Sequence, residues 1–100
     1  MMVKVLIKRQ FRKGHDTEIV ALLNDLRSRA MKQPGYISGI TLTSAEDPHQ
    51  MLVIGTWQRM ENWVAWKENA ERKGFDQMLA VYQEQATVYE TYLVGTPFDE

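Results

Sequence analysis

The side chains best suited to chemistry in this 100-residue sequence are a carboxamide and two indoles on one predicted helix. Asn62 stands four residues before Trp66, so the two share a helix face, and Trp63 lies within reach of both. An apolar cleft whose few polar donors are a carboxamide and an indole N–H is typical of a pocket for a small aromatic ligand. Both donors suit an oxygen atom that gains negative charge. Tryptophans at this spacing are equally typical of a hydrophobic core, so packing is an open alternative.

The other side chains that could act chemically carry weaker signals. His15 and His49 fall in predicted loops without a partner at metal-ligand spacing, so we predict no metal site, and His49 is kept as a candidate for proton transfer. Arg9 lies on the first predicted strand, where an exposed strand end and stabilisation of an anion are both open interpretations. The charged run at residues 68–73 is interpreted as a solvated helix face.

The elements that must position these groups follow the order βαββαβ. Apolar residues recur at helical spacing between Ile19 and Ala30 and predict a helix that stops before the Pro34-Gly35 pair. Helical spacing resumes after Gln58, and this second region is expected to break or bend at Gly74. Alternating or β-branched runs predict strands at residues 3–11, 36–44, 51–57 and 87–94.

This order is the split βαβ pattern of ferredoxin-like α+β domains, in which helices cover one face of a four-stranded antiparallel sheet. We expect one domain over residues 1–100, with its core between about 3 and 94. Apolar side chains, Leu6 and Tyr36 among them, are expected on the sheet face that the helices leave open. A sheet with two partly apolar faces needs a second layer, so we predict a homodimer joined through its sheet faces.

Composition narrows the classes of partner. Twelve basic and 13 acidic side chains give a net charge of -1, which offers no electrostatic footprint for nucleic acid or an anionic membrane. No apolar run approaches the roughly 20 residues that a membrane helix needs. The absence of cysteine excludes a disulfide framework and thiolate ligands. We therefore expect a small-molecule or protein partner, no nucleic acid, no membrane and a cytoplasmic location.

A family resemblance is carried by residues 34–66, PGYISGITLTSAEDPHQMLVIGTWQRMENWVAW. Its marks, in order, are Pro34-Gly35-Tyr36, the acidic-Pro loop at Asp47-Pro48, Trp57 at the end of a strand, and Trp66 nine residues later. Together they resemble the antibiotic biosynthesis monooxygenase domain family over roughly residues 3 to 94. The resemblance implies a ferredoxin-like homodimer whose two sheets form a shared barrel.

The resemblance also implies an activity. One branch of the family oxidises anthrone-like or quinol substrates with O2 and without metal or flavin, and Asn62 and Trp66 occupy the places of its Asn and Trp. A second branch degrades haem with an Asn on the first strand and an axial His. This sequence has Ile7 and Asp76 at those two places, which disfavours haem degradation.

We therefore predict a monooxygenase that needs no cofactor and oxidises a small quinol, phenol or anthrone with O2. Asn62 and Trp66 are the predicted catalytic residues, as hydrogen-bond donors to the developing oxyanion. A dimeric small-molecule-binding or stress-related protein without turnover is the alternative. The predicted substrate-binding residues are Ile7, Arg9, Trp63, Phe75 and Met78.

Overall fold

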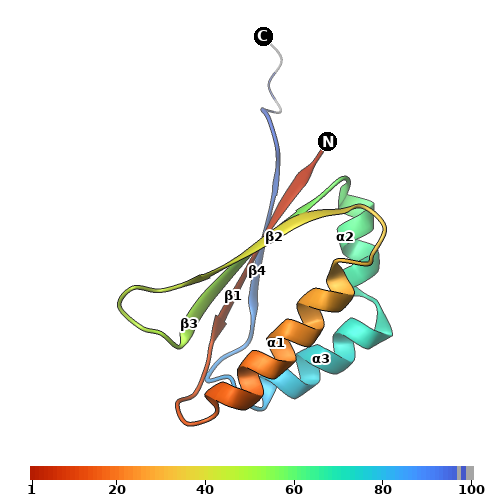
Figure 1. Ribbon diagram of the computed structural model, residues 1–100. Coiled ribbons are helices and arrows are strands. Elements are labelled where there is room, and N and C mark those ends of the chain that lie inside the picture. The colour runs from red at the N-terminus through yellow and green to blue at the C-terminus, as the bar shows by residue number, and fades with distance from the viewer. Residues whose placement is uncertain (97, 99–100) are drawn as a thin grey trace.

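The computed structural model describes residues 1–96 and 98, which form a four-stranded antiparallel sheet and three helices (Figure 1). The strand order is β2-β3-β1-β4. This arrangement confirms the predicted ferredoxin-like α+β fold. Within the described residues, no helix has the length and apolar character that crossing a bilayer requires. In chain order the elements are β1 (Val3–Gln10), α1 (Asp16–Ala30), β2 (Tyr36–Thr43), β3 (Gln50–Trp57), α2 (Met60–Lys67), α3 (Ala70–Ala80) and β4 (Val88–Leu93).

The second helical region is interrupted at Asn69, whereas a break or bend at Gly74 was expected. Asn69 has an extended backbone, with φ -62° and ψ 134°, and its side-chain oxygen accepts a hydrogen bond of 2.8 Å from the Glu71 N–H. This is an N-cap, which starts α3 as a helix of its own. Gly74 lies inside α3, because one interior glycine costs only about 1 kcal/mol relative to alanine and does not stop a helix.

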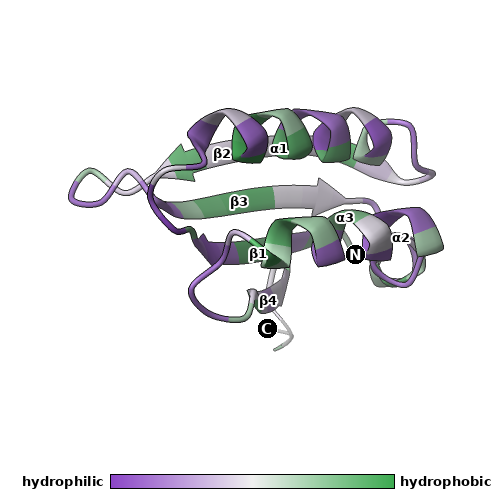
Figure 2. Cartoon of the chain, turned by 90° about the horizontal axis from the view of Figure 1, so that it is seen from below, coloured by the Kyte–Doolittle hydropathy of each residue, from purple (hydrophilic) through white to green (hydrophobic). Residues whose placement is uncertain are grey.

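The helices cover one face of the sheet, where the core lies. Figure 1 shows α1 and α3 side by side on that face, with α2 at one end of the sheet. Residues of β1 alternate between the faces, so Val3, Val5, Ile7 and Arg9 are buried under the helices. Figure 2 shows hydrophobic residues on β3 and on parts of α1 and α3. The first strand thus places a buried arginine among apolar side chains between the sheet and the helices.

The opposite face of the sheet carries a band of apolar side chains. In the strand register Ile54 lies beside Leu6 on one flank and Ile40 on the other. Ile40 and Tyr92 are each 53% exposed. We call this set the outer face. Its members are Leu6, Ile40, Leu42, Leu52, Ile54, Val88 and Tyr92.

Candidate active site

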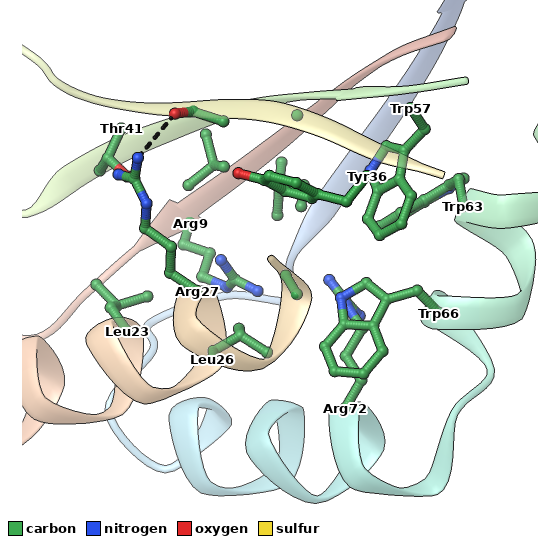
Figure 3. Close-up of a pocket in the computed structure, with 15 residues that line it drawn as sticks. Arg9, Leu23, Leu26, Arg27, Tyr36, Thr41, Trp57, Trp63, Trp66 and Arg72 are labelled. Atoms are coloured by element: carbon green, nitrogen blue, oxygen red, sulfur yellow. Dashed lines mark hydrogen bonds between the residues drawn. The ribbon is translucent and has the colours of Figure 1, made fainter. Parts of the chain in front are cut away.

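A pocket with a volume of about 90 Å³ lies between the sheet and the helices (Figure 3). It is smaller than the cavity of about 150 Å³ that admits benzene in another protein, so in this conformation at most a single aromatic ring fits. Its walls come from three strands and all three helices. The lining residues are Ile7, Arg9, Leu23, Leu26, Arg27, Ala30, Tyr36, Gly39, Thr41, Val53, Gly55, Trp57, Trp63, Trp66 and Arg72.

The floor of the pocket is a pair of glycines. Gly39 of β2 and Gly55 of β3 face each other in the register. A Cβ atom on Gly39 would lie 2.7 Å from the hydroxyl oxygen of Tyr36, and one on Gly55 would lie 3.4 Å from the indole nitrogen of Trp57. Glycine inside a strand often marks a place where another group approaches the backbone. Here two adjacent strands omit their side chains at the same point, and this leaves the space that forms the pocket.

Aromatic rings continue from this floor along one wall. The register shifts between Tyr36 and Ser38, and this irregularity turns Tyr36 toward the helices. The expectation that Tyr36 lies on the open face was therefore wrong. Its ring meets Trp57 edge-on at 5.4 Å, and Trp63 follows at 6.0 Å from Trp57. Tyr89 of β4 extends the row at 6.0 Å from Trp63.

The structure places the two predicted catalytic residues differently. Trp66 is 3% exposed and lines the pocket, and Figure 3 shows its indole nitrogen turned inward, toward the side where Arg9 lies. Asn62 is half-buried against the turn between α1 and β2, where a Cβ atom on Gly35 would collide with its side chain. Among the described residues Asn62 is outside the pocket lining. A joint catalytic role for the two stays a prediction.

Some of the predicted substrate-binding residues also line the pocket, and others lie outside the described lining. Ile7, Arg9 and Trp63 line the same cavity as Trp66. Phe75 is buried in the core with the guanidinium of an α1 arginine 5.3 Å above its ring, and Met78 is 46% exposed. Within the described part of the chain neither of these two lines the pocket. The binding roles of all five stay predictions.

Sequence reasoning missed a buried ionic cluster at the back of the pocket. Arg72, expected on a solvated helix face, is 1% exposed, so that interpretation was wrong for this residue. Its guanidinium donates to Asp76 at 2.7 Å and lies over the rings of Trp63 and Tyr89 at 5.0 and 5.4 Å. Arg9 reaches the other oxygen of Asp76 at 3.5 Å. The spacing of Arg72 and Asp76, four residues apart on a helix, was the available signal.

Arg9 stays charged despite its burial. Desolvation by burial lowers the pKa of Arg9, and the positive charge of Arg72 lowers it as well, whereas Tyr89 and Asp76 raise it. Because a guanidinium is a far stronger base than any other side chain, Arg9 keeps its proton in the physiological range. The apolar pocket therefore contains a permanent positive charge.

Arg27 lies at the pocket's boundary between α1 and β2. Its side chain is exposed and donates a hydrogen bond of 3.0 Å to the carbonyl oxygen of Gly39, drawn as the dashed line in Figure 3. The side chain thus bridges the helix and the edge strand beside the cavity. A ligand that enters between α1 and β2 must displace this contact.

His49 lies apart from the pocket. Its Nε2 atom is 3.0 Å from a carboxylate oxygen of Asp16, and its backbone N–H donates to Asp47 at 2.9 Å. These contacts join the connection between β2 and β3 to the first residue of α1. Among the described residues His49 is outside the pocket lining, and its role in proton transfer stays a prediction.

The chain is similar in sequence to a known protein family. Residues 2–77 match the family model described as antibiotic biosynthesis monooxygenase. Protein SchA of Streptomyces halstedii is 28% identical over 69 residues, which cover 69% of this chain and 18% of that protein's length.

Solved structures share the fold at lower identity. A conserved protein from Methanosarcina mazei Go1 superposes with a TM-score of 0.86 at 17% identity, covering 92% of this chain and 91% of the other. SnoaB, a cofactor-independent oxygenase from Streptomyces nogalater, gives a TM-score of 0.83 at 11% identity, with 99% and 98% covered. At these identities the likeness shows the fold.

Proposed function

This chain belongs to the antibiotic biosynthesis monooxygenase family, and from that premise we propose that it is a cofactor-independent monooxygenase that oxidises a small phenol or quinol. The observation that carries the proposal is the pocket itself, in which the indole of Trp66 and the guanidinium of Arg9 line a space of about 90 Å³. A tricyclic anthrone would require the pocket to open. SnoaB, which is similar in fold, is a cofactor-independent oxygenase.

The chemistry requires little beyond binding. A deprotonated phenol or quinol can give an electron to oxygen directly, so the protein has to hold the flat ring, favour its anion and exclude water. A quinol and O2 together contain the same atoms as a hydroxyquinone and water. One oxygen atom forms the new C–O bond and the other leaves as water, so no external reductant is needed.

The proposal includes a homodimer formed through the outer face. A sheet whose second face is apolar is stable in water only when another layer covers that face. In a two-fold dimer the same patch serves both protomers, so Ile54 and Leu6 of each copy would meet the apolar band of the other. Lys8 and Glu90, 3.0 Å apart on this face, add a polar pair to the apolar surface.

Oxygen consumption by metal-free protein tests the activity. A panel of one-ring phenols and quinols is supplied to protein treated with a chelator, and O2 uptake is followed with an electrode. We expect uptake that rises in proportion to protein concentration, is unchanged by added chelator and is lost on heat denaturation. Lys73→Met is a control substitution outside the pocket and should retain the uptake of the wild type. Lys73 pairs with Glu68 at 2.9 Å on the exposed side of α3.

The same experiment separates the enzyme from its alternative. Saturable binding of a phenol or quinol with no O2 uptake above that of denatured protein would contradict the proposal and favour a small-molecule-binding protein. Uptake that follows the metal content of the preparation would contradict it as well.

A further inference from the structure

The back of the pocket has more positive than negative charge. The side chains of Arg9 and Arg72 are 3% and 1% exposed, and both contact one carboxylate, that of Asp76. The phenol of Tyr89 also lies within 3.4 Å of Asp76. Two cations share one anion, so one positive charge is left over in a region from which water is largely excluded. An uncompensated buried charge is costly, and an incoming anion relieves that cost.

The rest of the lining does not balance this charge. Within the described residues, the pocket is lined by Arg9, Arg27 and Arg72 and by no aspartate or glutamate. The remaining lining residues are uncharged, and most are apolar or aromatic. A ligand in this space therefore meets apolar walls and positive charge at once.

Arg9 also has an unused hydrogen-bond donor. Its Nε atom is buried and has no hydrogen-bond partner within the described part of the chain. Buried donors are nearly always paired in folded proteins, and one that is not calls for an explanation. Figure 3 shows the guanidinium in the interior of the pocket, between α1 and the sheet. Both its charge and its free N–H are thus available to an oxygen placed there.

We propose that the pocket binds its aromatic ligand in the ionised form, with a phenolate oxygen held at the guanidinium of Arg9. The inference rests on the proposed function and specifies its substrate as a one-ring phenolate. Arg72 adds a second positive charge at the back of the pocket, and its hydrogen bond positions Asp76. The pocket takes up the phenolate that forms in solution, where the phenolic proton has already passed to water or buffer, so the reaction needs no histidine base beside the ring.

Anaerobic binding of para-nitrophenol tests this inference, because only its phenolate absorbs visible light. The probe is titrated with protein at several pH values, which gives separate affinities for the phenol and the phenolate. We expect the wild type to bind the phenolate tighter than the phenol by about tenfold or more, as a charge-assisted hydrogen bond provides. Arg9→Met should remove this preference, and Lys73→Met should retain it.

A second substitution keeps the test decisive if Arg9→Met does not fold. Arg9→Lys retains the charge but lacks the planar fork of donors, so it should reduce the preference. Equal affinity of the wild type for the two forms, or a full preference in a folded Arg9 variant, would overturn the inference. The probe requires no oxygen chemistry. A preference for the phenolate without O2 uptake would contradict only the proposed function. O2 uptake without this preference would contradict only the present inference.

Discussion

At the scale of single residues, the proposed function depends on polar groups set into an apolar wall. Trp66 and Arg9 are almost fully buried, yet each turns N–H groups toward the same cavity. Donors in a low-dielectric site act on charge more strongly than they would in water. They are also fixed before the ligand arrives, so no reorganisation is required when negative charge develops on the substrate.

Trp66→Phe and Asn62→Ala test the two predicted catalytic donors. Loss of one donor to a developing oxyanion typically lowers kcat by about 10²–10³. We expect a decrease of this order in O2 turnover for Trp66→Phe, because Trp66 lines the pocket, and a smaller decrease for Asn62→Ala, because Asn62 lies against Gly35 outside the described lining. Trp66→Phe keeps an aromatic ring in the wall and costs about 1 kcal/mol of stability. Turnover and thermal unfolding are measured on the same preparations. Wild-type turnover in both variants would remove the roles proposed for these side chains.

Sequence patterns predicted part of the pocket lining, because periodicity within one strand or one helix shows which side chains point toward the core. Ile7 and Arg9 alternate inward on the first strand, and Trp63 and Trp66 fall on the inner side of their helix. Arg72 could not be identified in this way. Its burial depends on Tyr89, a residue 17 positions away that only the tertiary structure brings beside it.

At the scale of elements, the facing glycines of β2 and β3 create the pocket. Gly55→Val would add a side chain to the floor at a position with no positive φ, in a strand that accepts β-branched residues. We expect para-nitrophenol affinity to fall by about tenfold or more, because even small volume changes are felt in packed interiors. The melting temperature should be similar to that of the wild type. Unchanged affinity in a folded Gly55→Val protein would place the ligand elsewhere.

The connection between β2 and β3 provides a prediction about pH. The backbone N–H of His49 and the side chain of Gln10 both donate to the carboxylate of Asp47 and lower its pKa. A depressed folded-state pKa stabilises the fold above the unfolded pKa of about 4, and this contribution is lost as the pH falls through the folded value. Asp47→Asn should therefore melt below the wild type at neutral pH.

Thermal unfolding of both proteins across the acid range checks this prediction. The difference in melting temperature should shrink steadily below about pH 4 and vanish once Asp47 is protonated in the folded state. A difference that is independent of pH, or that grows on acidification, would contradict the assigned contribution of Asp47.

The order of elements was predictable because each begins or ends at a strong local signal, such as the Pro34-Gly35 pair. Two details of the elements were not predictable from the sequence. The helix boundary lies at Asn69 because its side chain caps α3, whereas Gly74 is accommodated inside that helix. The shift at Tyr36 depends on how β2 pairs with β3, which periodicity within one strand does not reveal.

On the scale of the whole molecule, we propose that the outer face forms the interface of a dimer. Ile54 lies at its centre, between Leu6 and Ile40. In the proposed dimer Ile54→Lys would bury an unpaired charge, which costs several kcal/mol. Light scattering should give twice the chain mass of 11.7 kDa for the wild type and the single mass for this variant.

Val20→Lys is the matched control, because Val20 is an apolar residue of α1 that is 49% exposed on the helical side of the molecule. It should remain dimeric. A wild type that elutes with the mass of one chain, or an Ile54→Lys protein that stays dimeric, would show that the outer face has another role.

Incorporation of labelled oxygen tests the central claim most directly. Metal-free protein is incubated with a one-ring quinol under isotopically labelled O2, and the product is analysed by mass spectrometry. We expect a hydroxyquinone carrying one labelled oxygen atom, with the second labelled atom in water, and a much lower yield from Trp66→Phe. A product without labelled oxygen, or the same yield from denatured protein, would contradict it.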